Sequence, residues 1–149
     1  MSGPVPTTRR RRTLEAPSEQ IWAIVADPHH LPRWWPRAAR VEDVTGERWT
    51  MVLATAKGRN VRADYRVVTS EPPRRRRFAQ ELEGSPFERL LRSSEVEIAL
   101  ADAGGGTEVT MELSQKLRGA SRLGGFMFRG AARRTLDEAL ESLERAVVG

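Results

Sequence analysis

The chain has 149 residues, of which 39% are hydrophobic, and its formal net charge at neutral pH is +5. This length supports one domain with one hydrophobic core and is too short for two. The chain contains no cysteine, which excludes a disulfide framework, a thiolate metal site and a cysteine nucleophile. The longest apolar run, residues 21–26, is far too short to cross a bilayer, so we expect a soluble, cytoplasmic protein.

The basic residues are almost all arginine. Of the 25 basic residues only Lys57 and Lys116 are lysine, and two runs of four arginines stand out, at residues 9–12 and 74–77. A GC-rich genome favours arginine codons and explains this bias without any binding role. Alternatively, clustered arginines are the electrostatic signature of a surface that binds phosphate groups. Charge alone leaves both explanations open.

Residues 1–7 are predicted to be disordered, and the first strand is predicted to cover Thr8 to Glu15. Strand alternation places two of the arginines at 9–12 on each face of this strand. We favour an edge strand, in which charged side chains discourage pairing with another chain.

A distinctive stretch follows between Ala16 and Pro36, with the sequence APSEQIWAIVADPHHLPRWWP. Pro17 suits a first helical turn, and an apolar stripe at helical spacing follows it. Asp27 can cap a second short helix that has a proline at its first position, and Pro36 closes that helix. The stretch therefore predicts two short helices, one directly after the other.

This pattern of Ala-Pro, Ile-Trp, Asp-Pro, Leu and Trp-Trp-Pro resembles the start of the START-like, birch-allergen-like superfamily. That superfamily is also called SRPBCC or polyketide cyclase/dehydrase-like. The resemblance implies an α+β helix-grip fold, in which a curved antiparallel sheet of six or seven strands surrounds a long C-terminal helix. Because the resemblance covers nearly the whole chain, we expect a single domain of this kind over residues 8–149.

Alternating apolar and polar residues predict the remaining strands. The candidates are separated by turn residues and cover residues 41–44, 49–55, 61–67, 78–82, 87–101 and 109–113. Several of them have one apolar and one charged face, which is typical of a sheet with one side in water. We expect both arginine runs to be solvated.

The longest candidate strand, residues 87–101, gives a specific site prediction. Its apolar face carries Val96 and Ile98, and extending the alternation backwards places Arg92 and Ser94 on the same inward face. A β-bulge would reverse this assignment. An inward Arg92 needs an acidic, polar or watery partner, because burying an unpaired charge is costly.

The last predicted element is a helix from about Ser121 to Val148, the helix that the sheet would grip. Its apolar stripe consists of Leu136, Leu140, Leu143 and Val147.

Common metal, nucleotide and nucleophile motifs do not fit this sequence. The adjacent His29 and His30 lack HxxxH spacing and are predicted to be solvated, so we predict no metal site. The glycines at 104–106 lead into a strand and match no phosphate-binding motif, and no serine lies in a nucleophile elbow. We therefore predict no cofactor.

The resemblance implies an internal cavity between the sheet and the C-terminal helix for a small hydrophobic or aromatic molecule, such as a polyketide, a lipid or a quinone. The predicted lining combines aromatic, apolar and polar side chains: Trp35, Trp49, Met51, Tyr65, Phe78, Gln80, Arg92, Ser94, Phe126 and Met127. Tyr65 is a candidate proton donor, and Arg92 is a candidate for stabilising developing negative charge.

Three functions remain open. The first is a binding or carrier module for such a ligand, and the second is a polyketide cyclase or dehydrase that acts on it. The third is contact between the arginine-rich surface and a membrane or RNA. Because aromatic residues are not interleaved with the arginine runs, we consider nucleic acid an unlikely partner, whereas peripheral membrane contact stays open. We expect a monomer or a weak homodimer.

Overall fold

The computed structural model describes residues 5–119 and 125–148 of the chain. Its first element, β1 (Thr7–Leu14), begins one residue earlier than predicted. The backbone carbonyl of Pro6 already accepts a hydrogen bond from the Gln115 N–H at 3.1 Å. The N-terminus that we predicted to be disordered, residues 1–7, lies partly outside the described residues.

The short helices lie where the sequence predicts them and comprise α1 (Ser18–Val25), the 3-10 turn η1 (Pro28–His30) and α2 (Leu31–Trp34). Pro17 precedes α1 in an extended conformation. The Asp27 carboxylate accepts a hydrogen bond from the His29 backbone N–H at 3.0 Å and so caps η1. The extended backbone of Trp35 ends α2 just before Pro36.

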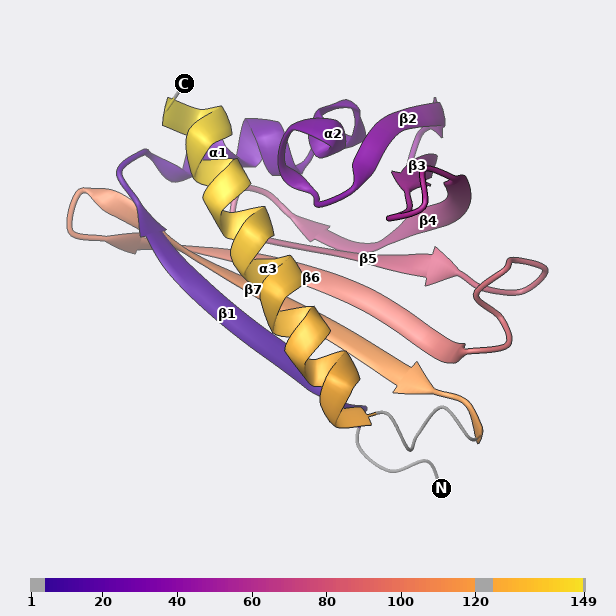
Figure 1. The fold of residues 1–149 in the computed structure, drawn as a ribbon. Helices are drawn as coiled ribbons and strands as arrows, with labels where there is room; N and C mark the ends of the chain where they lie inside the picture. The colour runs from indigo at the N-terminus through magenta and orange to yellow at the C-terminus, as the bar shows by residue number, and fades with distance from the viewer. Residues whose placement is uncertain (1–4, 120–124, 149) are drawn as a thin grey trace.

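Seven antiparallel strands form one sheet in the order β1-β7-β6-β5-β4-β3-β2. The strands after β1 are β2 (Ala38–Thr45), β3 (Arg48–Ala54), β4 (Asn60–Glu71), β5 (Arg75–Glu81), β6 (Leu91–Ala103) and β7 (Gly106–Leu117). Since β1 and β2 are the two edge strands, the helices that connect them must cross from one edge to the other. They therefore lie across one end of the sheet (Figure 1).

The long helix α3 (Gly125–Val148) lies across one face of the sheet, which we call the inner face (Figure 1). Its buried stripe packs toward β1, β7 and α2 and includes Leu136, Ala139, Leu140, Leu143 and Val147. The predicted start of the helix at Ser121 lies outside the described residues. This arrangement is the α+β helix-grip fold. Within the described residues, neither α3 nor any other helix is long and apolar enough to cross a membrane.

A β-bulge near the start of β6 changes the predicted register of Arg92. Leu91 pairs with Leu117 of β7 and Ser93 pairs with Lys116, so Arg92 is an additional residue between the two pairs. Leu91 is consequently buried and Arg92 is exposed. Our prediction of an inward-facing Arg92 is wrong, because it continued the alternation through the bulge.

Candidate functional site

Four aromatic side chains meet at the inner face, and we call them the aromatic cluster: Trp35, Trp49, Tyr65 and Phe78. Trp49 on β3 stacks on Tyr65 of β4, with ring centroids 5.9 Å apart and 10° between the ring planes. Phe78 on β5 meets both rings edge-on, at 5.4 and 5.7 Å. Trp35 follows α2 and packs edge-on against Phe78 at 6.4 Å. Strand register brings the cluster together, since Trp49 lies directly opposite Tyr65.

Polar groups continue the inner face beyond the aromatic cluster, toward the end of β5 and the start of β6. Gln80 lies opposite Tyr65 in the strand register. Ser94 is buried, and its hydroxyl accepts a hydrogen bond from the Gln115 side chain at 3.2 Å. The inner face therefore has an aromatic region and a polar end.

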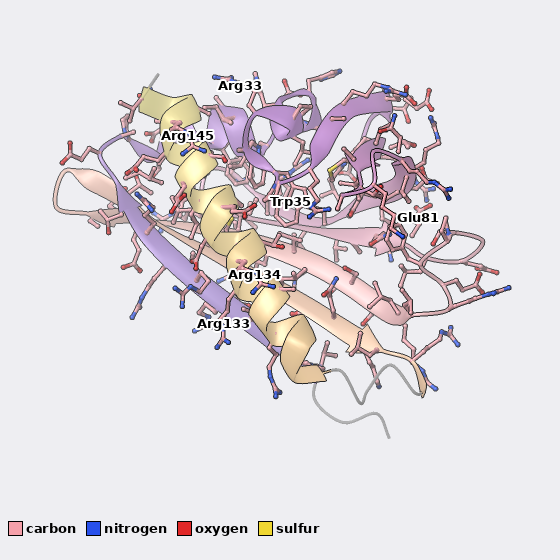
Figure 2. The ribbon with its side chains drawn as sticks, in the orientation of Figure 1. Arg33, Trp35, Glu81, Arg133, Arg134 and Arg145 are labelled. Carbon is pink, nitrogen blue, oxygen red and sulfur yellow. The ribbon has the colours of Figure 1, made fainter. Side chains whose placement is uncertain are left out.

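A cleft of about 660 Å³ opens at this polar end. Strands β5 and β6 pair only over residues 75–79 of β5, and beyond that point the loop of residues 82–90 connects them. Glu81 marks this end of β5 in Figure 2. The lining includes the inner-face residues Gln80, Leu91 and Ser94, charged side chains such as Glu81 and Arg92, and the outer-face residues Arg66, Ala79 and Glu95. The cleft therefore reaches from solvent to the polar end of the inner face.

A buried arginine next to the aromatic cluster was missed in the sequence analysis. Arg76 on β5 is only 8% exposed, and its guanidinium carbon lies 6.0 Å from the centroid of the Trp49 ring. The prediction that the whole run 74–77 is solvated is wrong for this residue. Because Phe78 and Gln80 face inward, residue 76 must do so too, and the same alternation extended two residues backwards would have identified it.

The charge of Arg76 is poorly compensated. Within the described residues, its guanidinium donates one hydrogen bond, to the Ser70 hydroxyl at 3.5 Å, and forms no ion pair with a carboxylate. Burial lowers the pKa of Arg76, and the negative charges of Glu47 and Asp27 oppose that change. Since arginine stays protonated in proteins, a largely buried positive charge, with slight contact to solvent, lies beside Trp49.

Three buried side-chain nitrogen atoms have no hydrogen-bond partner in the part of the chain that the structure describes. They are Nε1 of Trp34, Nε1 of Trp49 and Nε2 of Gln80, and all three are donors. Buried polar atoms are normally paired, so each of these needs an explanation. Together with Arg76, they give the interior an excess of hydrogen-bond donors.

The Tyr65 hydroxyl is the second candidate catalytic group. The residue is 8% exposed, and burial raises the pKa of Tyr65 well above its ordinary value. The phenol is therefore protonated at neutral pH and is suited to donating a hydrogen bond or a proton rather than to acting as a base.

The predicted lining residues divide into three groups. Those at or beside the inner face are Trp35, Trp49, Met51, Tyr65, Phe78, Gln80 and Ser94. Arg92 is exposed at the bulge and lines the cleft instead of the interior. The side chains of Phe126 and Met127 lie outside the described residues. A role for any of these residues in binding stays a prediction.

The two histidines lie at the helical end of the fold. Nδ1 of His29 is 2.8 Å from the Asp27 carboxylate, and Nε2 of His30 is 3.7 Å from it. Arg33 of α2 lies near the C-terminal end of α3, where it donates a hydrogen bond to the Ala146 carbonyl at 3.1 Å (Figure 2). These contacts hold the short helices and α3 together.

The exposed arginines face acidic neighbours. The run 9–12 is exposed as predicted, and three of its members pair with β7 or α3: Arg9 with Glu112, Arg10 with Asp137, and Arg12 with Glu144. In the second run, Arg75 and Arg77 both approach Glu97 on the outer face. Much of the surface positive charge is thus balanced locally, whereas that of Arg76 is not.

The family model described as polyketide cyclase / dehydrase and lipid transport matches residues 6–148 of this sequence. The chain belongs to this family. A START superfamily protein from Mycobacterium smegmatis has the same fold, with a TM-score of 0.78, 16% identity, and coverage of 95% of this chain and 96% of that chain. A conserved protein from Geobacillus kaustophilus gives a TM-score of 0.78 at 17% identity and covers 96% and 95% of the two chains.

Ara h 8.0201 has a similar structure, with a TM-score of 0.73, 14% identity, and coverage of 97% of this chain and 99% of that chain. At such identities the similarity supports the fold alone. No curated protein matches the sequence significantly. Membership of the polyketide cyclase / dehydrase and lipid transport family implies binding of hydrophobic molecules in general, while the ligand and any reaction must be argued from the site.

Proposed function

We propose that this protein binds a small, largely apolar molecule between the inner face of its sheet and α3. The aromatic cluster and Met51 supply the apolar surface for the ligand. Gln80 and Ser94 supply polar contacts at the end nearest the cleft. The family description, which includes lipid transport, supports a ligand of this kind.

The observation that carries this proposal is the position of the cleft. It opens where β5 and β6 separate, and its lining includes Gln80, Leu91 and Ser94 from the inner face. Gln80 lies opposite Tyr65 in the strand register, so part of the cleft lining is next to the aromatic cluster. A protein that takes up a ligand needs such a route from solvent to apolar surface, whereas a protein with only a packed core does not.

Binding of a neutral fluorescent probe, N-phenylnaphthylamine, tests the proposal. Ser94→Phe places a bulky ring where the cleft meets the inner face and should weaken probe binding by about tenfold or more. Ala99→Phe is the matched control, because Ala99 lies on the same strand with its side chain on the outer face. It should change the affinity by less than about threefold.

Circular dichroism and thermal unfolding establish that both variants are folded. If Ser94→Phe does not fold, Gln80→Phe tests the same cleft from β5. The proposal fails if the wild-type protein binds neither this probe nor its anionic analogue, anilinonaphthalene sulfonate, or if folded variants on the two faces bind the probe equally well.

Catalysis of the polyketide cyclase or dehydrase type is the second candidate function, and two buried residues that each contact Trp49, namely Arg76 and Tyr65, favour it. When an enolate carbon attacks a ketone, a carbon–carbon bond forms and negative charge develops on the ketone oxygen. A guanidinium can stabilise that charge, and a protonated phenol can donate a proton to it. Incubation with a poly-β-keto thioester separates the candidates, because an enzyme would produce a cyclised or dehydrated product that mass spectrometry detects, whereas a carrier would return the compound unchanged.

Binding of a polyanion by the arginine-rich surface has less support. Most members of the run 9–12 have acidic partners on β7 or α3. Local ion pairs of this kind reduce the charge that a phosphate backbone or an anionic membrane can attract.

A further inference from the structure

Arg76 stands apart from the arginines beside it in the same strand. Arg75 and Arg77 lie on the outer face, where both approach Glu97. Arg76 points the other way, is 8% exposed, and its one hydrogen bond within the described residues, to Ser70, is at 3.5 Å, the limit of such a bond. A guanidinium carries five N–H donors, so most of the hydrogen-bonding capacity of Arg76 is not used by protein groups. Its remaining nitrogen atoms are not among the fully buried unpaired atoms, so the guanidinium keeps slight contact with solvent.

A packed core would not normally keep such a group. Burying a charge without a partner is costly, and arginine is almost never fully buried unless it is paired. Glu47 and Asp27 act on Arg76 through their charge but form no ion pair with it. Contact with the face of Trp49 contributes some cation–π attraction and leaves the in-plane N–H donors of the guanidinium free.

The buried side-chain atoms of the described residues that lack a hydrogen-bond partner are all donors, as the guanidinium of Arg76 is. Nε1 of Trp49 and of Trp34 and Nε2 of Gln80 are buried donors without acceptors, and no buried side-chain acceptor in the described residues lacks a donor. A purely apolar ligand would leave all of these donors unpaired. A ligand that brings a negatively charged oxygen atom would neutralise Arg76 and would pair with the N–H of Trp49, the one of these residues that contacts Arg76.

We propose that the ligand is an apolar acid, an aromatic or aliphatic body with one carboxylate or a similar oxyanion, and that Arg76 binds this group with help from Nε1 of Trp49. This inference rests on the proposed function, since it specifies the class of ligand that occupies the same site. It assigns Arg76 as the group that selects anionic over neutral ligands of equal size.

A pair of fluorescent probes with a shared skeleton tests the inference. Anilinonaphthalene sulfonate carries an oxyanion, and N-phenylnaphthylamine is the same molecule without it. Arg76→Met keeps the apolar stem of the side chain and removes its donors and charge, so it should weaken binding of the sulfonate by about ten- to a hundredfold. Affinity for the neutral probe should change by less than about threefold.

Arg75→Met is the matched control, because it removes the same group one residue away on the outer face. It should leave both affinities within about threefold of wild type. Arg76→Gln is the second variant if Arg76→Met does not fold. Displacement of the sulfonate by naphthoate and by dodecanoate then shows whether an aromatic or an aliphatic acid fits better.

The possible outcomes separate the two proposals. If the wild-type protein binds neither probe, the proposed function fails. Two outcomes would overturn the assignment of Arg76 while the binding function stands. In the first, both probes bind and Arg76→Met weakens their binding equally. In the second, Arg75→Met weakens binding of the sulfonate as much as Arg76→Met does. A loss confined to the sulfonate and to the Arg76 variants supports the inference, and such a loss should persist from about 50 to 500 mM salt because buried charges are weakly screened.

Discussion

The guanidinium carbon of Arg76 lies 6.0 Å from the centroid of the Trp49 ring, and Tyr65 stacks on the same ring in a nearly parallel orientation. Trp49 therefore links a buried positive charge to the apolar surface of the inner face. The indole nitrogen of the same residue has no hydrogen-bond partner within the described residues. One side chain thus offers a π face to the arginine and an N–H to a ligand oxygen.

The first prediction concerns stability in the absence of ligand. Arg76→Met should raise the free energy of unfolding by about 0.5 to 2 kcal/mol, because it replaces a largely buried charge that has no ion pair in the described residues by a shorter, apolar side chain. Urea unfolding of the ligand-free variant and wild type measures this difference. Greater stability together with weaker binding of an anionic probe is the pattern of a group that is retained for function.

The contrary result is equally informative. A loss of more than about 1 kcal/mol in Arg76→Met would indicate that packing on Trp49 stabilises the fold by more than burial of the charge costs. Arg75→Met again provides the comparison, and its effect should stay within about 0.5 kcal/mol, since its ion pair is exposed.

The second prediction concerns two glycines with opposite surroundings. A Cβ at Gly106, the first residue of β7, would collide with the backbone carbonyl of Leu14 at the end of β1, and backbone cannot rotate away as a side chain can. Gly106→Ala should therefore destabilise the protein by about 1 to 3 kcal/mol. In α3, a Cβ at Gly130 would meet no atom of the described residues within 4 Å, so Gly130→Ala should stabilise the protein by about 0.5 to 1 kcal/mol.

Thermal or urea unfolding of both alanine variants checks this prediction. If Gly106→Ala does not lower the free energy of unfolding, or changes it by the same amount as Gly130→Ala, then β1 and β7 can move apart enough to accommodate a methyl group.

The fold could be predicted because its local signals are strong and agree with one another. Asp27 and Pro28 predict the start of a helical turn, and in the structure Asp27 is the N-cap of η1, which begins at Pro28. The apolar stripe from Leu136 to Val147 predicts a helix with one buried face, and that face lies against the sheet. Helix capping and apolar periodicity therefore predicted the helices and strands, while the resemblance to the START-like superfamily predicted how they are arranged in space.

The site could be predicted only in part, and two arginines show why. The bulge that exposes Arg92 is defined by pairing with Lys116 and Leu117, which are more than twenty residues away, so no local pattern reveals it. Arg76 was predictable from the alternation around Phe78, but a run of four charged residues favoured a solvated segment. Alternation determines which face a side chain occupies, whereas burial of a charge depends on distant packing.

The third prediction concerns pH. Partial burial raises the pKa of Asp27, but hydrogen bonds from the His29 backbone and imidazole, with the charges of His29 and His30, lower it by more, so the net change is downward. A carboxylate whose pKa is lower in the folded state stabilises the protein above its unfolded pKa of about 4. This contribution is lost as the pH falls through the lower, folded pKa.

Asp27→Asn keeps an acceptor for the cap and removes the titration. In urea unfolding measured from about pH 5 to pH 2, the wild type should lose stability more steeply than the variant. Superimposable pH profiles would show that the contacts of Asp27 with the histidines do not contribute to acid stability.

The fourth prediction concerns a buried hydroxyl at the junction of β1 and the β6–β7 hairpin. Thr107 has no exposed surface, and its hydroxyl donates a hydrogen bond to the Ala16 carbonyl at 2.7 Å. Thr107→Val preserves the shape of the side chain but leaves that carbonyl without its donor, so it should destabilise the protein by about 1 to 3 kcal/mol. Thr110→Val on the outer face of the same strand is the control and should change stability by less than about 0.5 kcal/mol. Equal values from urea unfolding for the two variants would mean that the Ala16 carbonyl finds another donor, such as the Ser18 hydroxyl that lies 3.2 Å from that of Thr107.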